Sequence, residues 1–315
     1  MKMYREISSL CQDLGYSSRT LYSVSNTIEK HYHEAELIKS NGEIRLIRVP
    51  DKLLKSIQRR IADIILVQEP ISCYAMAYRV GGSTRQNANI HVGKKKVLKL
   101  DIRKFFDHIT YPMIKEKVFT ADNYSEPIRI LLSVLCVYIH QLPQGAPTSP
   151  AISNIIMRSF DKVIGDWCRE KDIAYSRYCD DMTFSGDFDE KEIVTFVDSE
   201  LRKNGFFLNH KKTVCLHDGQ RKEVTGIVVN EKISVPAYYK KKIRQELYYI
   251  NKYGVESHIA RMENNQSVDK YVSGLLGRIN YVISVEPHNE DMIGYRKMLL
   301  NIKGVIKHEN TNCSM

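Results

Sequence analysis

The sequence has 315 residues, of which 43% are hydrophobic and 27% are charged, and its mean hydropathy is −0.35. These values predict a soluble globular protein with a core large enough for one large domain or two closely packed ones. No run approaches the roughly eighteen apolar residues of a membrane span, and the N-terminus lacks the apolar core of a secretion signal. The seven cysteines form no CxxC pair, which favours free thiols in a reducing cytoplasm over a disulfide framework or a zinc site.

The charge of the chain favours a polyanionic partner. The formal net charge is +10 and the isoelectric point is about 9.1, and Lys and Arg side chains displace counterions from phosphates. The basic residues are concentrated between 202 and 252, where only Asp218, Glu223, Glu231 and Glu246 oppose them. This segment is either a solvated helix face or a surface that follows a phosphate backbone.

The first half of the chain predicts short helices and two strands. Residues 1–34 favour short supporting helices, and residues 43–49 favour a strand that ends at a proline. Apolar residues recur on one helical face over 52–66. Residues 97–102 predict a strand whose alternation places Asp101 on the face opposite its leucines.

A long helix, a hairpin and a second helix are predicted next. Ser149 as N-cap and the proline after it begin a helix that runs to about Lys171. Residues 173–186 predict two strands around a tight turn, and 189–204 predict a helix that ends before a glycine. A strand over 206–209 follows.

The C-terminal part is predicted to be helical and basic, with helices over 236–253 and about 268–283. We therefore place a domain boundary near 235. Strands mixed with longer helices before this boundary indicate an α+β fold rather than a sandwich or a bundle.

The strongest chemical signal is the adjacent pair Asp180 and Asp181 at the predicted hairpin turn. Two neighbouring carboxylates repel each other and lose solvation when they are buried, and Mg²⁺ can neutralise them. Asp101 from another strand is the natural third ligand, and two ions held by such a set activate an attacking hydroxyl and stabilise a leaving pyrophosphate. Taken alone, an Asp-Asp pair is more often a solvated turn.

The motifs around these aspartates resemble those of reverse transcriptases, in the family's order across roughly residues 43 to 230. Four segments carry the resemblance: Tyr178–Asp181 as the YxDD box, Leu100–Ile102 with Phe105–Phe106, Leu142–Pro150, and Leu208–Asn209 with Lys212–Thr213. An NAxxH motif at Asn87–His91 and a VTG motif at Val224–Gly226 are similar to those of the bacterial retron branch. The resemblance implies a right-hand polymerase, with fingers and palm over 1–235 and a helical, RNA-binding thumb over 236–315.

The resemblance also implies roles for individual residues. Asp101, Asp180 and Asp181 are expected to be catalytic and to bind two Mg²⁺ ions. The nucleotide-binding residues are expected to be Arg48, Ile102, Phe106, Gln144, Gly145 and Lys212. The RNA-binding residues are expected to be Asn87, His91, Lys240, Lys241, Lys242 and Arg244.

Several of these roles have plainer alternatives. Because Phe105 and Phe106 are adjacent, one is expected to pack inward, and we choose Phe106 as the ring that excludes a 2′-hydroxyl. Either Arg45 or Arg48 is expected to clamp the triphosphate, with a surface position as the alternative for Arg48. Gln144 and Gly145 can be a plain turn, Lys212 can be one of a solvated lysine pair, and His91 is by default a structural hydrogen-bonding group.

The function that the resemblance implies is an RNA-directed DNA polymerase of a retron. Its partners would be dNTPs, a structured noncoding RNA that is template and primer, the DNA product, and an accessory effector protein, with no membrane. Synthesis would start from a guanosine 2′-hydroxyl and give branched msDNA in a cytoplasmic antiphage system. The chain length leaves no room for a fused effector or maturase domain. The alternatives are a catalytically idle RNA-binding scaffold and a group II intron-type or diversity-generating enzyme.

Overall fold

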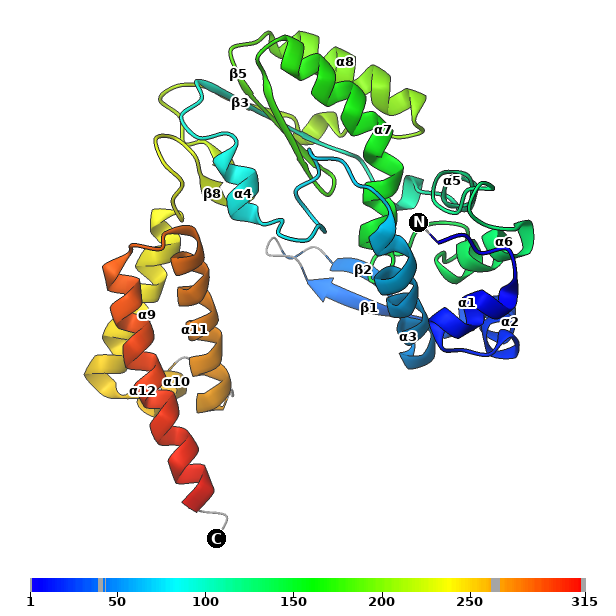
Figure 1. The fold of residues 1–315 in the computed structure, drawn as a ribbon. Helices are drawn as coiled ribbons and strands as arrows, with labels where there is room; N and C mark the ends of the chain where they lie inside the picture. The colour runs from blue at the N-terminus through cyan, green and yellow to red at the C-terminus, as the bar shows by residue number, and fades with distance from the viewer. Residues whose placement is uncertain (1, 39–41, 43, 262–266, 313–315) are drawn as a thin grey trace. The chain divides into compact units, whose positions relative to one another are not determined.

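The computed structural model describes residues 2–38, 42, 44–261 and 267–312, and the chain forms two compact units (Figure 1). Unit 1 comprises Met1–Ser83 and Lys95–Asp218, and unit 2 comprises Thr84–Lys94 and Gly219–Met315. Among the described residues, no helix is long and apolar enough to cross a membrane.

Unit 1 is built around a four-stranded antiparallel sheet in the order β4-β5-β3-β6. The strands are β3 (Lys96–Asp101), β4 (Ala174–Tyr178), β5 (Asp181–Gly186) and β6 (Val214–Leu216). The long helices α7 (Ser149–Glu170) and α8 (Glu190–Lys203) lie against this sheet (Figure 1). Leu98, Leu100 and Phe184 are buried in the core that the sheet and the helices share. The alternation predicted for β3 is thereby confirmed.

The N-terminal part of unit 1 adds helices and a hairpin. Its elements are α1 (Ile7–Leu14), α2 (Ser18–Asn26), the 3₁₀ turn η1 (Ile28–His31), β1 (Tyr32–Ile38), β2 (Ile44–Pro50) and α3 (Lys52–Arg60). The helix expected over 52–66 ends its α-helical part at Arg60 and continues as a π-turn, η2 (Ile61–Ile65), and a 3₁₀ turn, η3 (Leu66–Gln68). The sequence did not predict β1: residues 32–34 were expected in the short N-terminal helices, and residues 35–38 were assigned to no element.

The middle of unit 1 contains three elements that the sequence analysis did not predict: η4 (Phe106–His108), α5 (Tyr111–Lys117) and α6 (Glu126–Leu135). Both helices have proline in their first turn, which is a start signal. The buried apolar residues of α5 and α6 join the same hydrophobic core as the sheet.

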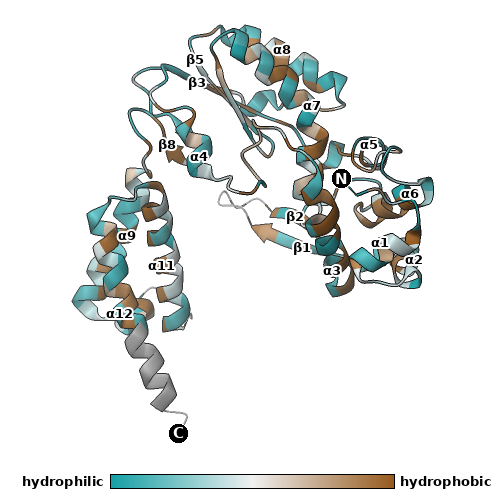
Figure 2. Cartoon of the chain, in the orientation of Figure 1, coloured by the Kyte–Doolittle hydropathy of each residue, from teal (hydrophilic) through white to brown (hydrophobic). Residues whose placement is uncertain are grey.

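The two long helices that lie against the sheet, α7 and α8, are amphipathic: hydrophobic and hydrophilic residues alternate along them (Figure 2).

Two local predictions in unit 1 need correction. The N-cap of α7 is Thr148 rather than Ser149, whose hydroxyl donates to the Pro143 carbonyl oxygen at 2.7 Å. Residues 206–209 do not form a strand. They make a single bridge between Leu208 and Ile102, and the turn η5 (His210–Lys212) follows.

Unit 2 combines a small hairpin with helices. Its elements are α4 (Thr84–Asn89), β7 (Glu223–Val224), β8 (Ile227–Val228), α9 (Ala237–Tyr253), α10 (Val255–Arg261), α11 (Val268–Val285) and α12 (Glu290–Asn312). The predicted helices over 236–253 and 268–283 are confirmed as α9 and α11. The compact units divide after Asp218, and a functional boundary near 235 stays a prediction. The fold class is α+β, as predicted.

Candidate active site

The two adjacent aspartates lie at the tight turn between β4 and β5. Cys179 adopts a left-handed conformation with φ 62°, and the Ile102 amide donates to the Asp180 carbonyl oxygen at 3.0 Å. Asp101 and Asp181 are direct partners in the β3–β5 register, and directly opposite residues have their side chains on the same face of a sheet. The fold therefore brings the three predicted aspartates together.

The three carboxylates create a local excess of negative charge. Burial, followed by the neighbouring carboxylates of Asp180 and Asp101, raises the pKa of Asp181 to about 6. Lys212 Nζ donates to Asp101 Oδ1 at 2.6 Å, and Asn209 Nδ2 donates to Asp101 Oδ2 at 3.0 Å. One lysine leaves the trio net negative, and the oxygen ligands suit a hard divalent cation. These residues fit the divalent metal that the aspartate pattern implied.

A buried ion pair contacts the β4–β5 turn from the protein interior. Arg177 and Asp161 are fully buried, and Arg177 Nη2 lies 2.7 Å from Asp161 Oδ2. Arg177 Nη1 also donates to the Cys179 carbonyl oxygen at 2.9 Å, and Tyr175 donates its hydroxyl hydrogen to Asp161 Oδ1 at 3.0 Å. The left-handed turn is therefore fixed from inside the core. The pair is not apparent in the sequence because its members lie on different elements, α7 and β4.

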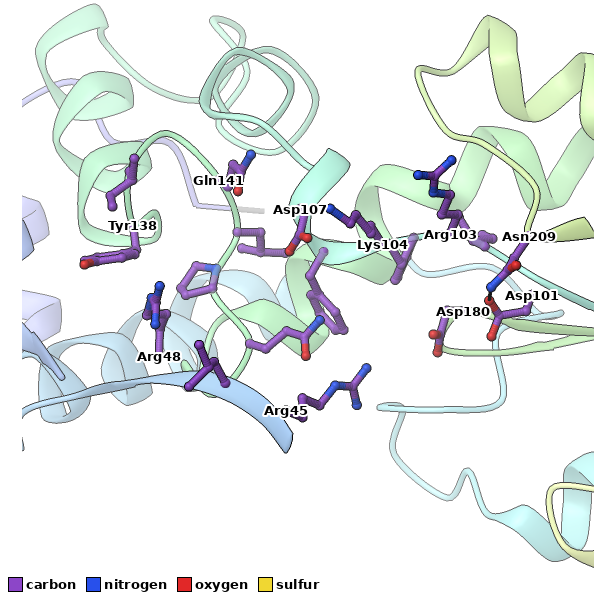
Figure 3. Close-up of a pocket in the computed structure, with 18 of the residues that line it drawn as sticks. Arg45, Arg48, Asp101, Arg103, Lys104, Asp107, Tyr138, Gln141, Asp180 and Asn209 are labelled. Carbon is purple, nitrogen blue, oxygen red and sulfur yellow. Dashed lines mark hydrogen bonds between the residues drawn. The ribbon is translucent and has the colours of Figure 1, made fainter. Parts of the chain in front are cut away.

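A cavity of about 840 Å³ opens beside the aspartates, within unit 1 (Figure 3). Asp101, Asp180 and Asn209 lie together at one end of it, and Arg48 lies beside Tyr138 at the other (Figure 3). All six predicted nucleotide-binding residues except Gly145 line this cavity, namely Arg48, Ile102, Phe106, Gln144 and Lys212. Such a volume is in the range of small-molecule sites.

The two phenylalanines divide as expected. Phe105 is buried, whereas Phe106 is half-buried and lines the cavity. Phe106 also lines a neighbouring cavity of about 520 Å³, together with Gln144 and Gly145. Phe106 therefore lines two neighbouring cavities, and Asp101 and Asp180 line the larger of these two.

The strand β2 passes directly over the Gln144–Gly145 turn. The Arg48 amide donates to the Gln144 carbonyl oxygen at 2.9 Å. Gly145 has φ +119°, and a Cβ there would lie 2.7 Å from the Arg48 carbonyl oxygen. Only glycine tolerates both the conformation and the close approach, which gives Gly145 a structural reason in this turn. A nucleotide-binding role for Gln144 and Gly145 stays a prediction.

The two arginines of β2 differ in their present contacts. Arg48 Nη1 lies 2.5 Å from Glu34 Oε1, and its guanidinium lies 5.3 Å from the centre of the Tyr138 ring. Arg45 is exposed and lines both cavities. A triphosphate would therefore compete with Glu34 for Arg48. Arg48 is the arginine expected from the sequence to bind the nucleotide, with Arg45 as the other candidate for the clamp.

The NAxxH and VTG motifs come together in unit 2. Thr225 and Gly226 form the two-residue turn of the β7–β8 hairpin with φ values of 47° and 78°, as a type I′ turn requires. Asn87 Nδ2 donates to Thr225 Oγ1 at 3.5 Å, and Thr225 Oγ1 donates to the Thr84 carbonyl oxygen at 3.3 Å. Nothing in the sequence predicts this pairing, because the two motifs are far apart in the chain.

The expected RNA contacts of Asn87 and His91 need correction. Asn87 is 1% exposed and His91 is 0% exposed, so neither side chain lies on a surface that RNA can reach. Burial, followed by the charge of Lys94, lowers the pKa of His91 to about 3, so the imidazole is neutral. Both residues are structural in this conformation, which is the alternative that was open for His91.

The four basic residues predicted on α9 also differ from one another. Lys240 Nζ lies 2.8 Å from Glu286 Oε1, and Arg244 pairs with Asp291 at 3.1 Å. Lys241 and Lys242 are exposed. Lys240 and Arg244 therefore connect α9 to the end of α11 and to α12. Lys241 and Lys242 are available to solvent.

Comparison with known proteins agrees with this geometry. Residues 28–244 match the family model described as reverse transcriptase (RNA-dependent DNA polymerase). The match spans more than half of the chain, so the protein belongs to this family. Its activity is RNA-directed DNA polymerisation from dNTPs on a nucleic-acid template.

The relatives identify the branch of the family. Retron Mx65 reverse transcriptase from Myxococcus xanthus is 27% identical over 321 residues, covering 94% of this chain and 72% of the relative. Retron Ec83 reverse transcriptase from Escherichia coli is 30% identical over 279 residues, covering 82% and 84%. The chain is a bacterial retron-type reverse transcriptase. A Candida albicans telomerase solved with a fragment of telomeric RNA has a TM-score of 0.44 at 12% identity, covering 85% of this chain and 59% of that one.

Proposed function

We propose that Asp101, Asp180 and Asp181 bind two Mg²⁺ ions and carry nucleotidyl transfer in this enzyme. The observation that supports this most directly is that Asp101 and Asp180 line one end of the cavity while Asp181 lies directly opposite Asp101 in the sheet. Two such ions, when bound, activate the primer hydroxyl and stabilise the leaving pyrophosphate. The carboxylates supply the oxygen ligands, and a cation would offset both the burial and the mutual repulsion that raise the pKa of Asp181.

The other residues of the cavity would position the nucleotide. Phe106 presents its ring where a 2′-hydroxyl would clash, which selects deoxynucleotides. Arg48 or the exposed Arg45 would contact phosphate oxygens through charged hydrogen bonds. Lys212 would leave Asp101 for the pyrophosphate, to which it can donate a proton. Gly145 allows the turn that carries Gln144 to lie close to Arg48 of β2.

We further propose that the template and primer is a structured noncoding RNA, and that synthesis from a guanosine 2′-hydroxyl yields branched msDNA. Support comes from the retron relatives and from the exposed basic residues of α9, Lys241 and Lys242. An A-form stem is recognised mainly by shape and backbone, which suits such a helix. Asn87 and His91 would act indirectly, by holding the β7–β8 hairpin. An antiphage role with an accessory effector, in the cytoplasm, completes the proposal.

The test is the nucleic acid that copurifies with the protein when it is expressed with its native flanking locus. Wild type is compared with Asp180→Asn, and each extract is treated with RNase and then with DNase. A short DNA of fixed length, joined to RNA and missing from Asp180→Asn, is the expected result. A debranching nuclease that separates the DNA from the RNA would establish the 2′-linkage.

Two other results have distinct meanings. RNA alone in both samples contradicts the msDNA proposal and favours an RNA-binding scaffold. DNA that is present but lacks a branch contradicts only the 2′-hydroxyl priming step.

A further inference from the structure

A second group of metal-binding side chains lies in unit 1, outside the aspartate site. Glu190, Cys215 and His217 each place one ligand atom within 4.8 Å of the others. They form the one cluster of three or more His, Cys, Asp or Glu ligands of this kind in the part of the chain that the structure describes. Neither the polymerase activity nor the retron assignment uses these residues.

The fold fixes the directions from which the three ligands approach. Cys215 lies in the edge strand β6, opposite Leu98 of β3, and His217 follows two residues later, a spacing that returns to the same side of an extended chain. Glu190 is the first residue of α8, and Asp189 caps this helix by accepting from the Lys191 amide at 2.9 Å. The end of β6 and the start of α8 therefore place their three ligand atoms close together.

The ligand chemistry differs from that of the aspartates. A thiolate, an imidazole and a carboxylate suit Zn²⁺, whereas Mg²⁺ prefers oxygen ligands. The thiolate and the carboxylate together neutralise a divalent ion. Glu190 and Cys215 are half-buried and His217 is exposed, so a fourth position faces water.

We propose that Glu190, Cys215 and His217 bind one zinc ion that clamps β6 to the start of α8. The clamp matters because β6 follows closely on Asn209 and Lys212, whose side chains hold Asp101. Zinc would fix the far end of this segment. The site is structural, and it is invisible as a sequence motif because its ligands come from two separate elements.

The test uses the full-length protein, stripped of metal and titrated with Co²⁺ as a zinc substitute in excess Mg²⁺. Cobalt bound to a thiolate gives a near-ultraviolet charge-transfer band that carboxylate sites cannot give. We expect this band at one equivalent per chain and its displacement by Zn²⁺. Cys215→Ser should abolish the band, and it should weaken zinc binding by more than about 100-fold, the upper end for loss of an outer-shell partner.

Two further variants make the result decisive. Cys73→Ser removes an exposed cysteine outside the cluster and should leave the band unchanged. Glu190→Gln keeps the thiolate and should retain the band while weakening zinc binding by about tenfold; it also serves if Cys215→Ser fails to give a native circular dichroism spectrum. Absence of the band in wild type, or unchanged zinc affinity in Glu190→Gln, would overturn the proposal.

Discussion

The β4–β5 and β7–β8 turns each place a non-glycine residue in the left-handed region, and a buried polar side chain supports each of these two turns. In the β4–β5 turn, Arg177 donates to the carbonyl oxygen of Cys179. In the β7–β8 turn, Asn87 donates to the hydroxyl of Thr225. The first turn presents the carboxylate of Asp180 to a cavity, whereas Thr225 and Gly226 of the second turn carry no ionisable group.

The supports of the two turns differ in strength. Arg177 and Asp161 are a charged pair that is fully removed from water, and removing one member leaves the other charge buried and unpaired. The contact between Asn87 and Thr225 is neutral and long, so its net contribution is about that of one ordinary hydrogen bond. The stronger of the two supports, the buried Arg177–Asp161 ion pair, therefore belongs to the turn that carries Asp180 and Asp181.

The largest expected effect concerns Asp101, the β3 carboxylate that lies opposite Asp181 beside the first turn. Asp101→Asn should lower dNTP incorporation on a primed RNA template by about 10³-fold, because the metal loses a charged ligand and several kcal/mol of transition-state stabilisation. Single-turnover incorporation measures this loss. Asp107→Asn, which changes an exposed carboxylate on the same cavity, should remain close to wild type. Equal losses in both variants would mean that general charge, rather than the trio, drives the reaction.

The next largest effect concerns the buried ion pair between Arg177 and Asp161. Arg177→Met should lower the free energy of unfolding by about 3 to 5 kcal/mol, because Asp161 remains charged and buried. Urea denaturation monitored by circular dichroism measures the change. Adding Asp161→Leu should recover much of the loss, since the lone buried charge is then gone. A single variant as stable as wild type would show that the pair is not what fixes the catalytic turn.

The pH dependence of the metal-free protein sharpens the same contrast. The pKa of Asp181 is raised to about 6, above the value near 4 of an unfolded carboxyl. The folded protein therefore holds this proton more tightly, and its contribution to stability is present below pH 4 and is lost as the pH rises through 6. Solvent at the exposed side of Asp181 weakens the effect.

Thermal melting in EDTA between pH 5 and 7.5 measures this loss. The melting temperature of wild type should fall by more over this interval than that of Asp181→Asn, which lacks the titrating group. Parallel pH profiles in the two proteins would contradict the assignment. The β7–β8 turn has no titrating group of this kind, so its hydrogen exchange should show no matching step.

The sequence predicted the β4–β5 turn well because its signals are local. Alternation located β3 and the hairpin, and the spacing of Asp101 from Asp180 matched a known motif order. Arg177 and Asp161 were not predicted, because the sequence does not distinguish a buried arginine from an exposed one. Their burial becomes apparent only when α7 packs against β4. Asn87 and His91 were assigned to RNA for the same reason, since a motif indicates importance but not burial.

The smallest expected effect concerns the second turn. Asn87→Ala should destabilise the β7–β8 hairpin by about 1 kcal/mol, because Thr225 loses a contact that stabilises its left-handed conformation. Faster hydrogen exchange at the amides of β7 and β8 measures this. Asn89→Ala, an exposed change in the same helix, is the matched control. Incorporation on an external primed template should stay near wild type in both variants, because the turn lies outside the aspartate site. A large loss of incorporation in Asn87→Ala alone would show that the two turns are coupled, and that the second also serves the catalytic step.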